Sequence, residues 1–191
     1  MPSITPSLWF DDDLEEAAEF YTSVFPNSKI ESMNRFTADE PLARRGDDAD
    51  EPLARRGDDA DEPLARRGND VSGPRTRGEV VSGTFVLDGT RFVGINGGPQ
   101  FPFTEAVSFM VNCHDQDEVD YYTERLLDGG GQESQCGWLK DRFGVSWQIV
   151  PDRLFELLGD PDPARAAAAA KAMLGMRKIV IADLEAAAND A

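Results

Sequence analysis

The residue types most suited to chemistry lie close together in one stretch, SQCGWLKDRFGVSWQIVP at 134–151. Trp138 and Trp147 stand there beside a thiol, an amine, a carboxylate and an amide. Large aromatic side chains with a few polar groups commonly line small-molecule pockets, and the same composition suits the core of an ordinary hairpin. No acid–base pair stands out, so the stretch favours a binding pocket over a defined reaction.

Three residues of this stretch carry potentially reactive groups. Cys136 could act as a nucleophile, but no histidine lies near it in the sequence. A lone cysteine in a strand is usually a small buried apolar residue, and we favour that interpretation. Lys140 and Asp141 could form an ion pair in a site or a contact within a turn, and we favour the turn. The catalytic residues, if there are any, stay unknown.

The stretch is expected to fold as a β-hairpin with its turn at 141–144. Strand alternation places Trp147 and Gln148 on opposite faces, so Trp147 packs in the core if Gln148 faces a ligand. On the other arm Cys136, Trp138 and Lys140 share a face. Spacing alone does not say which face Trp138 takes.

Outside a repeat at 38–70, the chain reads as two halves with the same order, β-α-β-β-β. The expected elements of the first half are a strand at 4–10, a helix capped by Asp12 and ending before Pro26, and strands at 28–36, 79–87 and 91–95, the last two joined by Asp88-Gly89. Those of the second half are a strand at 106–113, a helix capped by Asp115 and ended by glycines at 129–131, a short strand at 132–134, and the hairpin.

The C-terminal part reads as mainly helical. We expect helices at 152–158 and at PARAAAAAKAML, a short strand at 178–181, and a final helix. We divide the chain into a first module at 1–99, a second at 100–151, and a helical extension at 152–191. The fold class is therefore α+β.

Residues 38–70 consist of three nearly identical copies of ADEPLARRGDD. Each copy offers one leucine beside proline, glycine and charged residues, which is too little apolar surface to offset the entropy of ordering. We interpret the repeat as a disordered surface loop that arose by tandem duplication.

The composition limits the classes of molecule that the protein is expected to bind. With 36 acidic against 19 basic residues, the net charge of −17 disfavours nucleic acid and anionic membranes. Abundant acid with only four lysines suits a cytoplasmic protein of a halophile, where salt screens self-repulsion. No apolar run is long enough for a membrane helix, the N-terminus lacks the pattern of a signal peptide, and two cysteines make no disulfide framework.

Six segments resemble the vicinal oxygen chelate superfamily of glyoxalases, bleomycin-resistance proteins and dioxygenases. The likeness is closest to its PhnB-like branch, the "3-demethylubiquinone-9 3-methyltransferase domain" proteins. The segments are ITPSLWF at 4–10, AAEFYTSVFPNSKI at 17–30, GTFVLDGTRFVGINGGP at 83–99, SFMVNCHDQDEVDYY at 108–122, the hairpin at 134–151, and AMLGMRKIVIADLEAA at 172–187. The resemblance implies two βαβββ modules with cupped mixed sheets, and a homodimer.

The resemblance also implies where a ligand would bind, because superfamily members use the strands that line the cup. The candidate ligand-binding residues on these strands are Ser7, Trp9, Asn96, Met110, Asn112, Trp138 and Gln148. Metal-using members often carry glutamate where this chain has Gln148, and a neutral amide without histidine makes a poor divalent site. We therefore expect no metal or other cofactor, and we interpret His114 as a surface residue.

The methyltransferase label rests on no donor-binding motif. The segment GINGGP at 94–99 is rich in glycine, but it follows a hairpin strand and no helix follows it. We interpret these glycines as sites of close backbone approach. The sequence thus favours a protein that binds a small, partly apolar molecule. The alternatives are a metal-dependent lyase, isomerase or dioxygenase, or the methyltransferase of the label.

Overall fold

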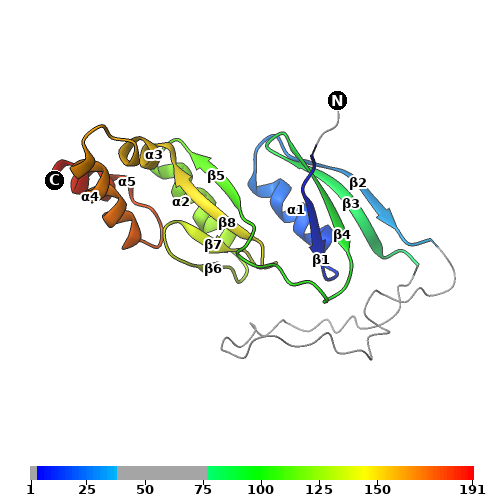
Figure 1. Ribbon diagram of the computed structural model, residues 1–191. Helices are drawn as coiled ribbons and strands as arrows, with labels where there is room; N and C mark the ends of the chain where they lie inside the picture. The colour runs from blue at the N-terminus through cyan, green and yellow to red at the C-terminus, as the bar shows by residue number, and fades with distance from the viewer. Residues whose placement is uncertain (1–3, 38–76) are drawn as a thin grey trace, which may run out of the picture. The chain divides into compact units, whose positions relative to one another are not determined.

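The computed structural model describes residues 4–37 and 77–191. These residues fall into two compact units, with the boundary between Pro102 and Phe103 (Figure 1). The repeat at 38–70, and its interpretation as a disordered loop, lie outside the described residues. The division into modules at 99 and 151 stays a prediction.

The first unit is a βαβββ module. Its elements are β1 (Ser7–Phe10), α1 (Leu14–Val24), β2 (Lys29–Arg35), β3 (Val80–Leu87) and β4 (Thr90–Asn96). The strand order is β1-β4-β3-β2, with β1 parallel to β4 and the other pairs antiparallel. Asp88 and Gly89, at φ 42° and 78°, form the predicted tight turn between β3 and β4.

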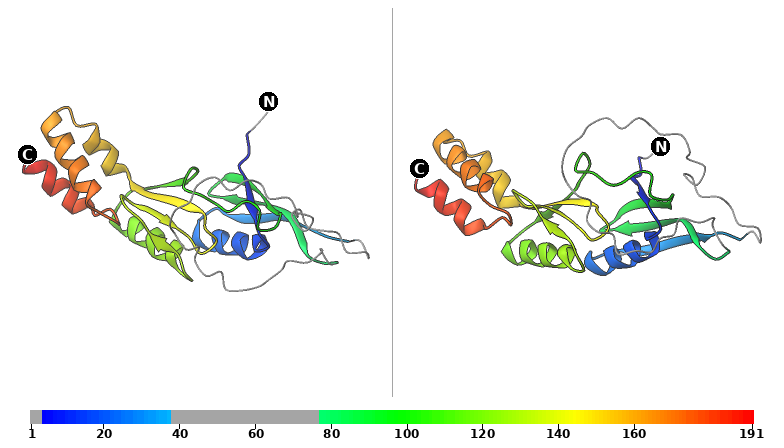
Figure 2. Two further views of the ribbon diagram at one scale, coloured as in Figure 1. Left: turned by 60° about the horizontal axis from the view of Figure 1, so that its bottom comes forward. Right: turned by 90° about the horizontal axis from the view of Figure 1, so that it is seen from below.

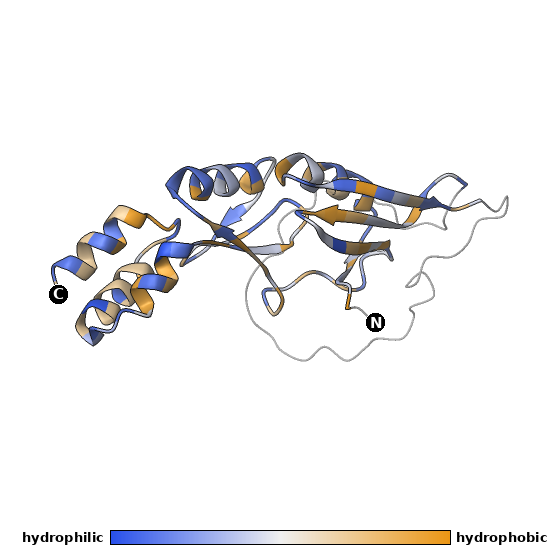
Figure 3. Cartoon of the chain, turned by 90° about the horizontal axis from the view of Figure 1, so that it is seen from above, coloured by the Kyte–Doolittle hydropathy of each residue, from blue (hydrophilic) through white to orange (hydrophobic). Residues whose placement is uncertain are grey.

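One helix covers one face of this sheet. The buried residues of α1 recur at helical spacing, and the hydropathy colours of its ribbon change accordingly along the helix (Figure 3). Tyr21 stacks on Phe85 at 6.3 Å between ring centroids, and Phe85 stacks on Phe92 at 5.5 Å. These aromatic rings anchor α1 to the middle of the sheet.

The β2–β3 pairing continues past the last residue of β2. Phe36 N donates to Glu79 O and Gly78 N donates to Phe36 O, both at 2.8 Å. The chain therefore leaves and re-enters the described structure at two neighbouring positions of one antiparallel pair.

The second unit repeats the order and adds three helices. Its elements are β5 (Phe109–Cys113), α2 (Gln116–Leu127), β6 (Gln132–Glu133), β7 (Trp138–Lys140), β8 (Ser146–Pro151), α3 (Asp152–Leu158), α4 (Pro163–Leu174) and α5 (Ile181–Asn189). The sheet order β5-β8-β7-β6, with β5 parallel to β8, matches that of the first unit. The expected α+β fold of two βαβββ modules with C-terminal helices is confirmed (Figure 2).

The two module helices begin in different ways. Asp115 caps α2 as predicted, accepting a 2.9 Å hydrogen bond from Glu118 N, while Glu118 Oε2 accepts from His114 N at 2.8 Å. The cap predicted for α1 is wrong. The N-cap residue is Asp13, whose side chain makes no capping hydrogen bond. The backbone N–H of Leu14 donates instead to the side chain of Asn96, at the end of β4.

The strand predicted at 178–181 is also wrong. This segment runs without regular structure into α5, because the side chain of Gln116 takes the place of a strand partner. Gln116 Nε2 donates to Ile179 O at 3.1 Å, and Gln116 Oε1 accepts from Ile181 N at 2.9 Å. Ile179 then packs with Val150, Leu154 and buried residues of α4 and α5 in one apolar cluster.

Within the described ranges, no helix is long and apolar enough to cross a membrane.

Candidate functional site

Three predicted site residues lie in a row across the second sheet. Met110 on β5 and Trp138 on β7 are both direct register partners of Gln148 on β8. Residues directly opposite one another on neighbouring strands share a face. Trp138 therefore lies on the face of Gln148, which answers the question that spacing left open.

The opposite face of this sheet is core. Trp147, Ile149 and Leu139 are buried there, against α2. The indole Nε1 of Trp147 donates a 2.8 Å hydrogen bond to Oδ2 of Asp141. The prediction that Trp147 packs in the core is confirmed.

The open face of the second sheet combines apolar and amide groups. The Met110 side chain is 45% exposed although it lies in a strand, and Asn112, two residues on, is exposed on the same face. Gln148 Nε2 donates to Ser108 Oγ at 2.7 Å, which fixes the orientation of its amide. A thioether, an indole and a positioned amide can hold an apolar molecule that also forms hydrogen bonds.

Asp141 organises the hairpin turn. Its Oδ1 accepts from Phe143 N at 2.9 Å and from Val145 N at 3.0 Å, and its side chain is buried. This confirms the turn interpretation of Asp141. Lys140 forms an ion pair with Glu105.

The strand interpretation of Cys136 is wrong. β7 begins only at Trp138, and Cys136 lies in the preceding turn at φ 58°, a left-handed conformation. Its amide donates to Met176 O at 2.8 Å, so this turn pairs with the segment between α4 and α5. Cys136 therefore has no face in common with Trp138 and Lys140.

On the first sheet, Ser7 and Trp9 lie on the face away from α1, opposite Val93 and Ile95. Ser7 is exposed, whereas Trp9 is held in place. Its Nε1 donates to Gly98 O at 2.9 Å, and its ring meets Phe101 edge-on at 5.1 Å.

Asn96 does not line the open face, contrary to expectation. It is the register partner of the buried Phe10, and it is only 2% exposed. Its Oδ1 accepts from Leu14 N at 3.0 Å, and its Nδ2 donates to Asp12 O at 3.2 Å and Val80 O at 3.1 Å. Asn96 thus caps the N-terminus of α1. Strand alternation places Asn96 on the face opposite to that of Ile95 and Trp9, and this pattern could have shown that it does not line the open face.

The glycines of 94–99 allow close packing, as predicted. A Cβ on Gly94 would lie 2.0 Å from Leu14 Cδ1, and a Cβ on Gly97 would lie 2.0 Å from Trp9 Cζ2. The space that glycine leaves is therefore filled by side chains of this chain. Such a segment does not offer the open cradle that a phosphate or methyl-donor loop requires.

The donors on the open faces do not suit a divalent metal. They are amides, a hydroxyl and a thioether, all neutral, whereas such metals prefer imidazole, thiolate or carboxylate. Within residues 4–37 and 77–191, no three His, Cys, Asp or Glu side chains are grouped as a metal site.

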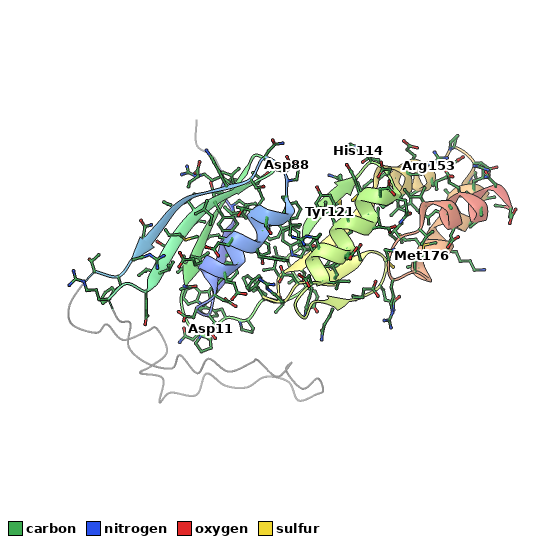
Figure 4. The ribbon with its side chains drawn as sticks, turned by 180° about the vertical axis from the view of Figure 1, so that it is seen from behind. Asp11, Asp88, His114, Tyr121, Arg153 and Met176 are labelled. Carbon is green, nitrogen blue, oxygen red and sulfur yellow. The ribbon has the colours of Figure 1, made fainter. Side chains whose placement is uncertain are left out.

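His114 lies at the surface, just before α2 (Figure 4). Its Nδ1 lies 2.8 Å from Asp152 Oδ2, and this hydrogen bond, with the nearby charge of Glu118, raises the pKa of His114. The surface interpretation of His114 is confirmed.

The family described as 3-demethylubiquinone-9 3-methyltransferase matches residues 2–50 and 62–150, most of the chain. The chain belongs to this PhnB-like family. The match ends at residue 150, so the residues of α3, α4 and α5 lie beyond it. No curated protein matches the chain.

Two solved structures are similar to the chain. A PhnB protein from Bacillus cereus, described provisionally as a 3-demethylubiquinone-9 3-methyltransferase, is 29% identical with a TM-score of 0.55. The alignment covers 78% of this chain and 99% of that one. A protein from Pseudomonas aeruginosa, 19% identical over 80% of this chain and all of its own, has a TM-score of 0.50 and shows the fold alone. The membership confirms the resemblance read from the sequence.

Two residues at the PhnB-like open face were not selected from the sequence. Ser146 alternates with Gln148 along β8, and Glu105 precedes β5 in a segment without periodicity. Alternation could have found Ser146, whereas no sequence signal points to Glu105.

Proposed function

We propose that this PhnB-like protein binds a small, partly apolar molecule on an open sheet face, without a metal. The observation that carries the proposal is the row of Trp138, Gln148 and Met110 across three neighbouring strands. An aromatic ring and a thioether flank an amide there, which is a common composition of ligand sites.

The polar groups of the row set the orientation of the ligand. Gln148 Nε2 is bonded to Ser108, while its Oε1 has no hydrogen bond within the part of the chain that is described. That oxygen can accept a hydrogen bond from a ligand hydroxyl or N–H. The apolar part of the ligand then covers Trp138 and Met110.

Methyl transfer and metal chemistry have less support on this chain. The family's description names a methyltransferase, but the glycine segment that would cradle a donor is packed against Trp9 and Leu14. A glutamate at 148 would give a charged metal ligand, and this chain has the neutral Gln148.

Calorimetry with 1-naphthylacetamide, a neutral aromatic amide, tests the proposal. We expect millimolar or tighter binding. Trp138→Ala is expected to weaken it about tenfold, because the naphthalene ring of the probe loses its stacking partner. Tyr121→Ala is the matched control, since Tyr121 is an exposed aromatic residue on α2 (Figure 4). Equal affinities of the two variants would place binding elsewhere.

Metal content and donor binding test the alternatives. We expect purified protein to hold far less than one divalent ion per chain, and millimolar S-adenosylmethionine to leave its melting temperature unchanged. One ion per chain that is lost in Gln148→Ala would overturn the metal-free proposal. A clear thermal shift with S-adenosylmethionine would favour the methyltransferase.

The proposal includes a homodimer. Light scattering is expected to give about twice the chain mass of 21.0 kDa. A mass of one chain at micromolar concentration would contradict it.

A further inference from the structure

The hydroxyl of Ser146 is buried and unused. The residue is 2% exposed, and its Oγ has no hydrogen-bond partner among the described residues. Nearly all buried polar groups in proteins are hydrogen-bonded, because burying an unpaired group costs its hydrogen bonds to water and no protein hydrogen bond offsets that loss. Strand alternation places Ser146 on the open face, two residues before Gln148.

The residue opposite Ser146 on the neighbouring strand is a lysine. Lys140 is the register partner of Ser146 on β7, so the two side chains share the face of Trp138 and Gln148. A hydroxyl and an ammonium group on the same face of neighbouring strands can together donate to the two oxygens of a carboxylate.

Lys140 is already paired with a carboxylate of the chain itself. Glu105, from the segment before β5, forms an ion pair with Lys140 Nζ. The same segment touches the hairpin turn, since a Cβ on Gly144 would lie 3.9 Å from Phe103 Cβ. The ammonium group also holds the pKa of Glu105 below its ordinary value, so Glu105 stays ionised at neutral pH.

This ion pair is easily displaced. Glu105 is largely exposed and projects from a segment without regular structure. Exposed ion pairs contribute little to stability, and their contribution falls further in salt. A ligand that offers a carboxylate and apolar contacts together can therefore compete with Glu105.

We infer that Ser146 and Lys140 form a subsite for the carboxylate of an apolar acid, and that Glu105 pairs with Lys140 in this subsite until the ligand displaces it. The inference rests on the proposed function and deepens it. The ring or chain of the ligand lies on Trp138 and Met110, and its carboxylate accepts hydrogen bonds from Ser146 Oγ and Lys140 Nζ. The ligand class is thus an aromatic or aliphatic carboxylic acid.

Calorimetry with 1-naphthylacetate and its neutral amide tests the subsite on the full chain. Glu105→Gln removes the competing charge and is expected to tighten binding of the acid at least fivefold, with binding of the amide unchanged. Ser146→Ala is expected to weaken the acid about tenfold, and Lys140→Met to abolish the preference for the acid. Glu133→Gln, an exposed carboxylate on β6, is the matched control and leaves both affinities unchanged.

Stability separates a ligand-binding hydroxyl from a structural one. Because Ser146 Oγ makes no hydrogen bond, Ser146→Ala is expected to keep or raise the melting temperature. A fall of several degrees would show a structural hydrogen bond and overturn the inference.

The outcomes also distinguish the inference from the proposed function. If both probes bind through Trp138 but Glu105→Gln and Ser146→Ala leave the acid-to-amide ratio unchanged, the subsite is wrong and the proposed function stands. If neither probe binds the parent chain or Glu105→Gln, both are overturned.

Discussion

Oδ2 of Asp141 accepts a 2.8 Å hydrogen bond from the indole of Trp147, across the turn of the β7–β8 hairpin. The other oxygen of the same carboxylate accepts from Phe143 N and Val145 N. One buried side chain thus fixes the turn, the start of β8 and a core aromatic residue. Since β8 also carries Gln148, this carboxylate sets the position of the candidate site.

Asp141→Ala is expected to lower the free energy of unfolding by about 3–5 kcal/mol, because three donors lose their acceptor in a buried place. Urea denaturation followed by tryptophan fluorescence measures the loss. Glu124→Ala, on the exposed face of α2, is expected to change it by less than about 0.5 kcal/mol. Equal losses in the two variants would contradict the structural role of Asp141.

Asn96 is expected to be as sensitive as a core residue. Asn96→Ala leaves the amide of Leu14 and two carbonyl oxygens without their partner, and a loss of about 3 kcal/mol follows. Asn96→Asp keeps an acceptor for the amide of Leu14, but it places a carboxylate oxygen where Nδ2 donated to two carbonyl oxygens. We expect a larger loss, because these oxygens repel one another. Asn34→Ala, at an exposed amide on β2, is the control, and thermal denaturation of the three variants ranks them.

The only histidine of the chain gives a direct test of local electrostatics. The hydrogen bond to Asp152 raises the pKa of His114 above its ordinary value of 6.5. The pair therefore stabilises the fold fully below about pH 6.5, and the contribution is lost as the pH rises through the raised pKa. An NMR titration is expected to show the raised pKa, and Asp152→Asn to lower it. An unchanged pKa in Asp152→Asn, or an equal fall in Asp128→Asn, would contradict this assignment.

The two thiols are expected to differ in reactivity. Burial, followed by the charges of Glu118 and Asp152, raises the pKa of the Cys113 thiol to about 12. Cys136 is only partly buried, in a turn. Because the thiolate is the reactive form, iodoacetamide should label one thiol per folded chain, and Cys136→Ser should abolish labelling. Two labelled thiols in the folded protein, counted by mass spectrometry, would contradict the burial of Cys113.

The net charge of −17 predicts a dependence on salt. Raising KCl from 0.1 to 2 M shortens the Debye length from about 10 Å to below about 3 Å and screens the self-repulsion of the folded chain. We expect the melting temperature to rise by several degrees. A melting temperature that stays level or falls would contradict the interpretation of this chain as a protein adapted to salt.

Sequence patterns predicted the elements well, because alternation, caps and turn residues act locally. Asp88-Gly89 and Asp115 are such signals, and both act as expected. Partners far apart in the chain were not predictable. Asn96 caps a helix that begins 82 residues earlier, and Gln116 holds a segment 63 residues later where a strand was expected.

The candidate site shows the same division. Alternation separated Trp147 from Gln148, but the face of Trp138 depends on the register between β7 and β8, which the spacing across a turn does not fix. Cys136 differs from its prediction because its φ of 58° ends strand geometry two residues before β7.

The hydrogen bonds between Phe36, Gly78 and Glu79 bear on how this chain can evolve. They close the β2–β3 pair at the point where the repeat-bearing segment is inserted. The pairing of these two strands therefore does not depend on the number of residues between them. The entropy of closing a chain between two fixed ends grows only with the logarithm of its length, so one more eleven-residue copy costs about 0.2 kcal/mol by this relation. We therefore expect copy number at this position to be close to neutral for folding of the sheet, so that replication slippage can change it without selection on the sheet.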